Sequence, residues 1–458
     1  MKNTTKRVYI VLLLLVAFLG GLGFMLYTFI TDGPTWVADR GNEHIYSYGS
    51  LTVAGTIYDR DGEELISTVD GERVYHDSEA VRRSTQHVVG DPEGYISTGV
   101  QNLYRSNLVG YNFANGIYNI LSSDKGCDIK LTIDADVSAA AYRAMDGDKG
   151  TVVVYNYKTG ETVCMVSAPN YDPLNKPEDI DSDTSGYYDG IYLNRAISGV
   201  FTPGSTFKVV TAIAAIENLP DVYEKEFYCT GKYTTGKGSG NGDVICFGVH
   251  HDIDFERGLN YSCNVVFGTL ANEIGAEKLT ETVRKLGFGK NVTISKADAV
   301  RSTFDVSKAT RLDLGWAGIG QYTTLVNPCQ MLMLMGGIAN GGKAMIPYLV
   351  EDSSELVDVK GKVNTDFVLS AETADKVKKL LRSNVENYYG DEKFPGLEMC
   401  GKTGTAEVTT GDDHAWFVGF SQREDFPYAV VVCLENGGSG YYDAIPVANA
   451  VMQALAED

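Results

Sequence analysis

A serine and a lysine three positions apart, Ser205 and Lys208, are the residues whose types and spacing best suit chemistry. Residues 202–204 (TPG) are typical of a turn. The almost wholly apolar run that follows to Leu219 predicts a buried helix with Ser205 in its first turn. On that helix the lysine amine can reach the serine hydroxyl, and the free N–H groups at the helix start favour a developing anion. The pattern therefore predicts an acyl-transfer site.

A second serine, Ser262, opens the short sequence Ser-Cys-Asn that ends at Asn264. Val265 begins another apolar run, so both side chains are expected at the start of a second helix. A hydroxyl there can relay a proton, and an amide can orient a neighbouring polar group. Ser262 and Asn264 are therefore candidate catalytic residues.

The third group of candidates is the sequence Lys-Thr-Gly-Thr at residues 402–405, which leads into a pair of predicted strands. On an extended strand Thr403 and Thr405 face one side while Lys402 and Gly404 face the other, so two hydroxyls would line a groove above an ammonium group. Gly404 leaves room for another backbone to approach. This strand is expected to bind the anionic end of a substrate.

Each of these motifs is short, and a chain of this length is expected to contain some matches by chance. Ser122 and Lys125, for example, have the same spacing as Ser205 and Lys208 but lie in a polar segment with no helix to follow. The three groups differ from such matches in the helices and strand predicted around them. Coincidence is the weaker explanation.

Together the motifs resemble those of the penicillin-binding proteins, in which a serine–x–x–lysine, a serine–x–asparagine and a lysine–threonine–glycine sequence recur. The resemblance implies a class B, monofunctional D,D-transpeptidase of the short type without a glycosyltransferase domain. Ala54 stands where the family usually has an arginine, so no salt bridge is inferred there. Further similar stretches are residues 55–62 (GTIYDRDG), 168–173 (APNYDP), 193–196 (LNRA), 201–205 (FTPGS) and 318–321 (GIGQ).

This resemblance implies a role for each candidate. Ser205 would attack the penultimate D-Ala carbonyl of a peptidoglycan stem peptide, or a β-lactam, with neutral Lys208 as the general base. Ser262 would pass the proton to the leaving amine, and Asn264 would orient Lys208. The backbone N–H groups of Ser205 and Thr405 would form the oxyanion hole. The residues expected to bind the substrate carboxylate are Lys402, Thr403, Gly404 and Thr405.

Two other classes of function share parts of this pattern. A D,D-carboxypeptidase or a serine β-lactamase uses the same acylation chemistry but needs a placed base for water, and no such base is evident after Ser262. A non-enzymatic β-lactam sensor would carry several membrane spans and a cytoplasmic effector, whereas this chain has one apolar span. A Ser-His-Asp hydrolase is disfavoured because the chain lacks the G-x-S-x-G sequence.

The composition excludes some partners. The net charge of −21 makes nucleic acid an unsuitable partner, because phosphate backbones select basic surfaces. The predicted reaction needs no cofactor. The chain contains no C-x-x-C pair, so the sequence predicts no metal site.

The N-terminal segment predicts a membrane anchor. Residues 8–30 carry no charge, and at about 1.5 Å per residue they suffice to cross a hydrocarbon core of about 30 Å. Lys2, Lys6 and Arg7 precede this run and Asp32 follows it, which places the short tail in the cytoplasm and the remaining chain outside. A cleaved signal peptide is the competing interpretation, but the run is longer than a usual signal core.

The pattern of strands and helices predicts an α+β protein with one antiparallel sheet packed against a helical cluster. We expect an anchor at residues 1–32, a small non-catalytic α+β module at 33–147 and a transpeptidase domain at 148–458. Strands are predicted at 151–156, 162–166, 415–420 and 428–434, with helices between them. The family resemblance implies a SEDS-type glycosyltransferase as the partner of the anchor and the small module.

Two of the eight cysteines could form a disulfide. Cys229 and Cys246 flank a Gly- and Ser-rich segment at residues 231–243, and a bridge between them would restrain this predicted loop in an extracytoplasmic domain. The sequence leaves the pairing open. Cys164, Cys329 and Cys433 lie in apolar runs and are expected to be buried thiols.

Overall fold

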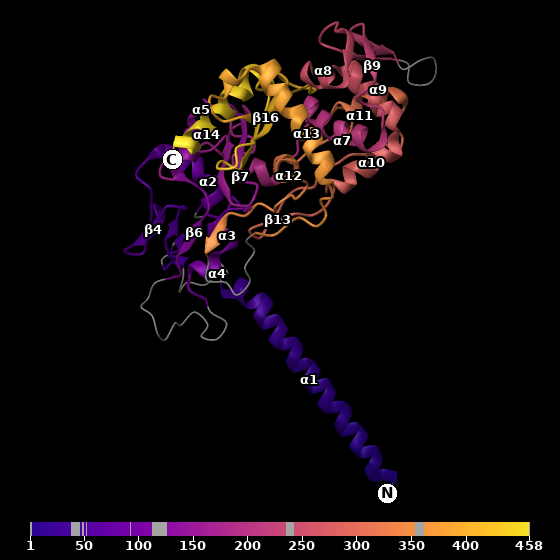
Figure 1. The fold of residues 1–458 in the computed structure, drawn as a ribbon. Coiled ribbons are helices and arrows are strands. Elements are labelled where there is room, and N and C mark those ends of the chain that lie inside the picture. The colour runs from indigo at the N-terminus through magenta and orange to yellow at the C-terminus, as the bar shows by residue number, and fades with distance from the viewer. Residues whose placement is uncertain are drawn as a thin grey trace.

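A computed structural model describes residues 2–37, 46–47, 50–51, 53–91, 93–111, 126–234, 242–352 and 361–457. It shows a rounded body of packed sheets and helices, from which one long helix extends (Figure 1). The predicted α+β class is confirmed. Ser122 and Lys125, the chance match to the catalytic pair, lie outside the described residues.

The centre of the body is a five-stranded antiparallel sheet with the strand order β16-β17-β18-β7-β8. The inner strands β17, β18 and β7 are rich in valine and aromatic residues, and all five strands are almost wholly buried, so both faces of the sheet are covered. Segments from the two ends of the predicted catalytic domain thus meet in one sheet, and β16 forms its edge. The strands are β7 (Gly150–Asn156), β8 (Thr162–Ala168), β16 (Met399–Ala406), β17 (His414–Ser421) and β18 (Tyr428–Leu434).

Successive residues of these strands enter two different cores. Val152 and Val154 belong to the core beneath α5 and α14, whereas Val153 and Tyr155 belong to the larger core that contains α7 and α12. This alternation is what a strand buried on both faces requires. The covering helices are α5 (Ala135–Ala144), α12 (Pro328–Ala339), α13 (Ala371–Asn384) and α14 (Ile445–Glu457).

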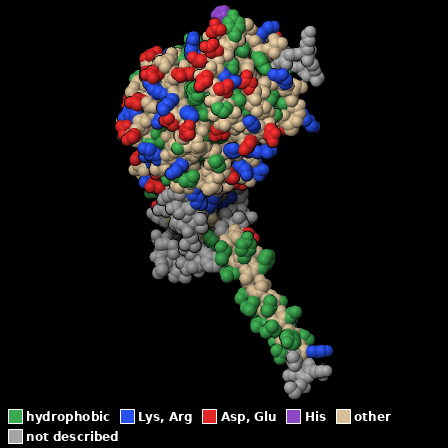
Figure 2. Space-filling view, turned by 45° about the vertical axis from the view of Figure 1, so that its right-hand side comes forward, with side chains coloured by type: hydrophobic (Ala, Val, Ile, Leu, Met, Phe, Trp, Pro, Cys, Tyr) green, Lys and Arg blue, Asp and Glu red, His purple; other side chains and the backbone are tan. Residues whose placement is uncertain are grey.

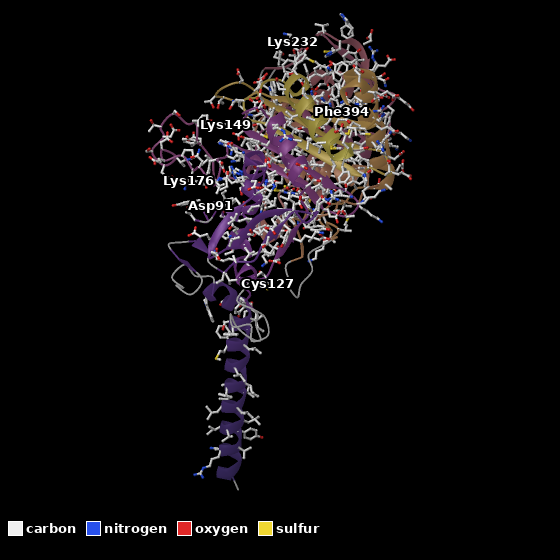
Figure 3. All side chains as sticks on the ribbon, turned by 90° about the vertical axis from the view of Figure 1, so that its left-hand side faces the viewer. Asp91, Cys127, Lys149, Lys176, Lys232 and Phe394 are labelled. Atoms are coloured by element: carbon white, nitrogen blue, oxygen red, sulfur yellow. The ribbon has the colours of Figure 1, made fainter. Side chains whose placement is uncertain are left out.

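A helical lobe packs beside the sheet edge and holds the predicted catalytic helix α7 near its centre (Figure 1). Two small hairpins cover its outer end, and Lys232 in one of them lies at the end of the molecule opposite the long helix (Figure 3). The helices of the lobe are α7 (Lys208–Asn218), α8 (Phe255–Asn260), α9 (Asn264–Ile274), α10 (Ala276–Lys285) and α11 (Arg311–Gly318). The hairpins pair β9 (Glu226–Cys229) with β12 (His251–Asp254) and β10 (Lys232–Thr234) with β11 (Asp243–Ile245).

A second five-stranded sheet lies toward the long helix, with the strand order β15-β6-β3-β4-β5. Four strands come from the predicted small module, but β15 comes from much later in the chain and pairs with β6. The strands are β3 (Ile57–Tyr58), β4 (Glu64–Val69), β5 (Glu72–Tyr75), β6 (Ile129–Leu131) and β15 (Val350–Asp352). The remaining helices are α2 (Glu79–Val89), α3 (Val100–Leu103), α4 (Arg105–Leu108) and α6 (Arg195–Ser198), and the other short strands are β1 (Tyr46–Ser47), β2 (Ser50–Leu51), β13 (Thr293–Ile294) and β14 (Ala297–Asp298).

The long helix is α1 (Lys2–Val37), and its segment Lys6–Gly33 is long and apolar enough to cross a membrane. Its hydrophobic side chains project on the sides visible in Figure 2, in contrast with the charged surface of the body. Cys127 lies near the base of the body where this helix meets it (Figure 3). One apolar N-terminal helix was predicted and is present.

The structure bears on two further expectations, one for the segment at residues 231–243 and one for the cysteine pairing that the sequence left open. The loop expected at residues 231–243 begins and ends in the β10–β11 hairpin, because alternating residues there pair across it. Cys229 and Cys246 are not disulfide-bonded, and every cysteine of the chain is a free thiol.

Candidate active site

The predicted nucleophile Ser205 lies in a single 3₁₀ turn, η1 (Gly204–Phe207), immediately before α7 begins at Lys208. Ser205 is 8% exposed, so its hydroxyl borders solvent while its backbone is enclosed. Gly204 has φ +52°, and a Cβ there would lie 2.6 Å from the carbonyl oxygen of Thr405. This position needs glycine because the turn touches the edge strand β16. The catalytic helix and the edge strand are thereby held at one place.

Lys208 is fully buried and its Nζ lies among four oxygens. The Nζ is 3.0 Å from Ser205 Oγ, 2.6 Å from Asn264 Oδ1, and 2.6 and 3.0 Å from the carbonyl oxygen and Oγ of Ser262. The carbonyl and amide oxygens can only accept hydrogen bonds. A neutral amine would give its two N–H donors to them, which leaves its lone pair for a hydroxyl proton.

Ser262 links the two lysines of the site. Its Oγ lies 3.0 Å from Lys208 Nζ and 3.1 Å from Lys402 Nζ. Ser262 has φ +52°, a left-handed conformation that is costly for a serine. The conformation places its hydroxyl and its carbonyl oxygen against the same amine, so the local strain coincides with the site.

Asn264 is the first residue of α9 and is fixed at both ends of its amide. Its Nδ2 donates to the carbonyl oxygen of Ile245 at 2.7 Å, and its Oδ1 accepts from Lys208 at 2.6 Å. The first bond settles which amide atom faces the lysine. Asn264 therefore presents an acceptor to Lys208.

Lys402 reaches the same place from β16 and is also fully buried. Its Nζ donates to Ser262 Oγ at 3.1 Å and to the carbonyl oxygen of Thr403 at 2.9 Å. Burial lowers the pKa of Lys402 to about 7. Burial, and secondarily the charge of Lys402, lowers the pKa of Lys208 well below its ordinary value. The lowered pKa favours the neutral form of Lys208, which is the form of an amine that can accept a proton.

The threonines of β16 face the open side of the strand, as predicted. Thr403 donates its backbone N–H to the Tyr389 hydroxyl at 3.0 Å, so this N–H points away from β17. The N–H of Thr405, two residues along the same strand, points the same way. Gly404 faces the other side, where a Cβ would lie 2.8 Å from the carbonyl oxygen of Pro203. The glycine lets β16 approach the turn that carries Ser205.

These groups open into a cleft of about 1020 Å³. Aromatic side chains form part of its wall, and sequence reasoning missed this feature. Tyr389 is the most consequential residue missed, because its hydroxyl binds both the backbone and the side chain of Thr403. The sequence did contain a signal, since tyrosines occur in adjacent pairs at residues 388–389 and 441–442. The aromatic residues that line the cleft are Phe247, Tyr261, Tyr388, Tyr389, Tyr441 and Tyr442.

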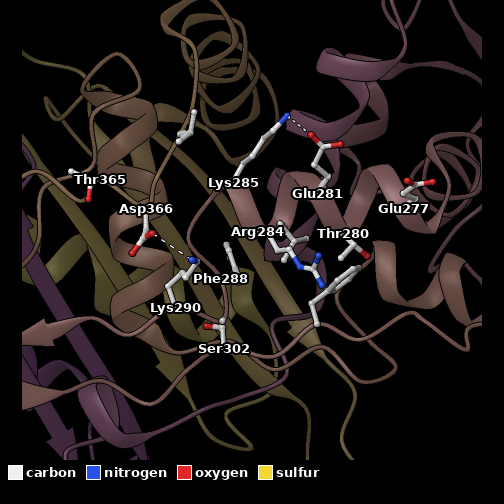
Figure 4. A pocket seen from close by; sticks show the side chains of 14 residues that line it. Glu277, Thr280, Glu281, Arg284, Lys285, Phe288, Lys290, Ser302, Thr365 and Asp366 are labelled. Atoms are coloured by element: carbon white, nitrogen blue, oxygen red, sulfur yellow. Dashed lines mark ion pairs between the residues drawn. The ribbon is translucent and has the colours of Figure 1, made fainter.

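A second hollow of about 820 Å³ lies beside α10 (Figure 4). Four of its charged residues form ion pairs, Lys285 with Glu281 and Lys290 with Asp366. The lining residues include none of the predicted catalytic groups. Of these two hollows, both formed by described residues, the cleft at Ser205 is the one that combines a nucleophile with buried lysines.

Comparison with known proteins places this geometry in a family. Residues 150–457 match the penicillin binding protein transpeptidase domain. The chain belongs to the penicillin-binding protein transpeptidase family. This confirms the resemblance drawn from the sequence motifs.

Individual relatives agree. The chain is 27% identical to the peptidoglycan D,D-transpeptidase PbpA of Mycolicibacterium smegmatis over the full length of both proteins. It is 25% identical to the stage V sporulation protein D of Bacillus subtilis over 85% of this chain and 65% of that protein. Penicillin-binding protein A from M. tuberculosis, solved as an imipenem acyl-enzyme complex, superposes with a TM-score of 0.75 and 25% identity, over 88% of this chain and 98% of that one.

Proposed function

We propose that this protein is a serine-type peptidoglycan D,D-transpeptidase that cross-links stem peptides through an acyl-Ser205 intermediate and binds penicillin covalently at the same residue. The observation that carries the proposal is the buried Lys208 amine, 3.0 Å from Ser205 Oγ and otherwise surrounded by acceptors. Family membership and the named transpeptidase relatives support it.

In the first step Ser205 Oγ attacks the carbonyl carbon of the penultimate D-Ala, and its proton passes to neutral Lys208. The carbonyl oxygen becomes an oxyanion, for which the N–H groups of Ser205 and Thr405 are the proposed donors. The position of Ser205 in the first turn before α7, and the outward N–H of β16, support this assignment.

In the second step the peptide C–N bond breaks and the departing D-Ala amine takes a proton. Ser262 Oγ, in contact with both lysines, is the proposed carrier of that proton from Lys208. The amine of a neighbouring stem peptide then attacks the acyl-serine carbonyl. Its proton returns through Ser262 and Lys208 to Ser205, which leaves as the free hydroxyl.

Lys402, Thr403 and Thr405 are the proposed binding site for the terminal carboxylate of the stem peptide or of penicillin. The two threonines face the cleft, and among the described residues no carboxylate pairs with Lys402. A bound anion would raise the pKa of Lys402 and fix its charge. Substrate binding thereby keeps Lys208 in its neutral form.

An acyl-transfer assay distinguishes a transpeptidase from a D,D-carboxypeptidase and from a β-lactamase. The full chain in detergent is given a peptide ending in D-Ala-D-Ala and an amine acceptor, and products are separated by chromatography. The proposal expects D-Ala release with an aminolysis product that rises with acceptor concentration. Hydrolysis alone would indicate a carboxypeptidase, and rapid penicillin turnover would indicate a β-lactamase.

We further propose that α1 anchors the protein in the cytoplasmic membrane and that the chain after Asp32 lies outside. The apolar segment Lys6–Gly33 and the basic residues before it support this topology. Protease added to intact spheroplasts should then digest the body. A protected large fragment would contradict the proposed orientation.

A SEDS-type glycosyltransferase is the proposed partner within the membrane, supported by the family resemblance alone. Such an enzyme would supply the glycan strands, and α1 with residues 33–147 would form the contact. Co-purification of an epitope-tagged chain from crosslinked cells, compared with a chain whose α1 is replaced by an unrelated apolar helix, tests the partnership. Equal recovery of the polymerase with both chains would exclude a contact through α1.

A further inference from the structure

Three cysteines and a histidine converge beside the catalytic motif. Cys229 ends β9, Cys246 follows β11, His250 precedes β12, and Cys263 lies between Ser262 and the start of α9. The four potential ligand atoms all lie within 4.8 Å of one another. The three thiols are buried and the imidazole is half-buried. None of these side chains has a role in the proposed reaction.

Two of the distances between these atoms match those in a tetrahedral metal site, and the others are within 4.8 Å. With metal bonds of about 2.3 Å to sulfur and about 2.0–2.1 Å to nitrogen, tetrahedral ligands lie about 3.8 Å apart for two sulfurs and about 3.5–3.6 Å apart for sulfur and nitrogen. The Sγ atoms of Cys246 and Cys263 are 3.8 Å apart, and Cys246 Sγ lies 3.6 Å from His250 Nδ1. A disulfide would need about 2.05 Å between sulfurs.

We propose that Cys229, Cys246, His250 and Cys263 bind one structural Zn²⁺ ion. Three thiolates and one imidazole form one of the ligand sets of closed, four-coordinate zinc sites, and soft thiolates select zinc over magnesium or calcium. The ligands come from separate segments, so the motif search that predicted no metal could not find them. This proposal is independent of the proposed transpeptidase activity.

A surrounding hydrogen bond supports a ligand role for Cys246. The backbone N–H of Asn264 donates to Cys246 Sγ at 3.3 Å. Bonds of this kind orient a thiolate toward its metal. The same bond ties the ligand cluster to the residue whose amide accepts from Lys208.

The ion would position the second catalytic motif. Cys263 stands between Ser262, which adopts a strained left-handed conformation, and Asn264. A metal bond to Cys263 would hold both neighbours against Lys208 and would join α9 to the two hairpins at the outer end of the lobe. The proposed ion would thus place Ser262 and Asn264.

Metal content tests the proposal directly. The full chain is purified in detergent without chelator. The protein is then digested in acid, and its zinc is measured by elemental mass spectrometry. We expect about one equivalent per chain. Cys229→Ser and His250→Ala should each bind zinc at least about tenfold more weakly and should therefore retain less of it after purification. Cys127→Ser and His251→Ala, a distant thiol and the adjacent imidazole, are matched controls that should keep it.

A second measurement needs no variant to fold. Replacing the ion with Co²⁺ in the unaltered chain should give thiolate-to-cobalt charge transfer and the intense visible bands of tetrahedral cobalt. Acylation by a fluorescent penicillin should slow about tenfold or more after chelation and recover when Zn²⁺ is returned. An unchanged rate after complete zinc removal would overturn the positioning role.

Two results would overturn the site itself. One is a disulfide among Cys229, Cys246 and Cys263, found by peptide mapping without reductant. The other is zinc content that is absent from the unaltered chain, or that stays equal in His250→Ala and His251→Ala. Free thiols protected from alkylation until a chelator is added would support the site.

Discussion

Two regions of the protein enclose cationic side chains, but only one of the two regions supplies a carboxylate partner among the described residues. Arg82 on α2 binds both oxygens of Asp172 at 2.7 and 2.8 Å, and the two side chains are 10% and 7% exposed. Its hydrogen bonds lower the pKa of Asp172. Lys208 and Lys402 are more deeply buried, yet among the described residues they contact only neutral oxygens.

The difference separates structural from functional charge. A buried cation with a carboxylate partner stays charged and fixes two elements, here α2 and the segment after β8. A buried cation without one has a lowered pKa, so it can give up its proton or wait for an anion from outside. The Arg82–Asp172 pair joins α2 to the segment after β8, whereas Lys208 is the proposed general base and Lys402 the proposed partner of a substrate carboxylate.

Among the substitutions of charged residues, removing Lys208 should produce the largest effect. Lys208→Ala deletes the proposed general base, so penicillin acylation should slow by about 10²- to 10⁴-fold while the fold is kept. Stopped-flow or gel labelling with a fluorescent penicillin measures the rate. Lys158→Ala, which removes a lysine at the exposed hairpin tip, should label like the unaltered chain. Equal rates for the two variants would refute the base assignment.

Breaking the carboxylate pair should instead affect stability. Asp172→Asn leaves the Arg82 guanidinium without its anion, and loss of one partner of a buried pair costs about 3 kcal/mol. Thermal or denaturant unfolding measures this change. The folded fraction should still be acylated at the normal rate. A catalytic defect without loss of stability would contradict the distinction between the two regions.

Lys402→Met should stabilise the fold and, at the same time, weaken binding of the substrate or penicillin carboxylate. The unfolded chain binds a proton at Lys402 up to a pKa near 10.4, whereas the folded chain releases it at about 7. Between these pH values the unfolded state binds more protons than the folded state. The amount by which Lys402 destabilises the folded state therefore decreases as pH rises. The gain in unfolding free energy, at least about 1 kcal/mol, should be largest below pH 7 and fade toward pH 10.4. A pH-independent gain would exclude this cause.

A surface pair should matter least. Lys379 and Asp375 on α13 lie 2.7 Å apart, but their side chains are 75% and 58% exposed. Water screens such pairs, so Lys379→Ala should leave both the melting temperature and the acylation rate within error. A large loss of stability would show that pairing alone, without burial, decides the role of a cation here.

Much of the fold followed from local pattern. The valine runs of β7 and β18 predicted strands, and the apolar run after Lys208 predicted a buried helix, because packing and periodicity act over neighbouring residues. The fold class and the family were predicted correctly. The pairing of β15 with β6 was not, since no local signal specifies a partner so distant in sequence.

The candidate site shows the same limit. The eight predicted site residues are all gathered around one cleft or directly beneath it. The left-handed backbone of Ser262, the π-helical turn η2 (Val385–Tyr389) that presents Tyr389 to Thr403, and the sulfur cluster around Cys263 depend on tertiary contacts. They could be found only once the chain was folded.

The central claim is that Ser205 is the acylated nucleophile. Mass spectrometry of a digest after penicillin labelling should locate one covalent adduct, on the peptide that contains Ser205, and Ser205→Ala should carry none even at saturating drug. Ser122→Ala, which changes the chance match, should label normally. An adduct on any other residue, or labelling that survives Ser205→Ala, would contradict the account.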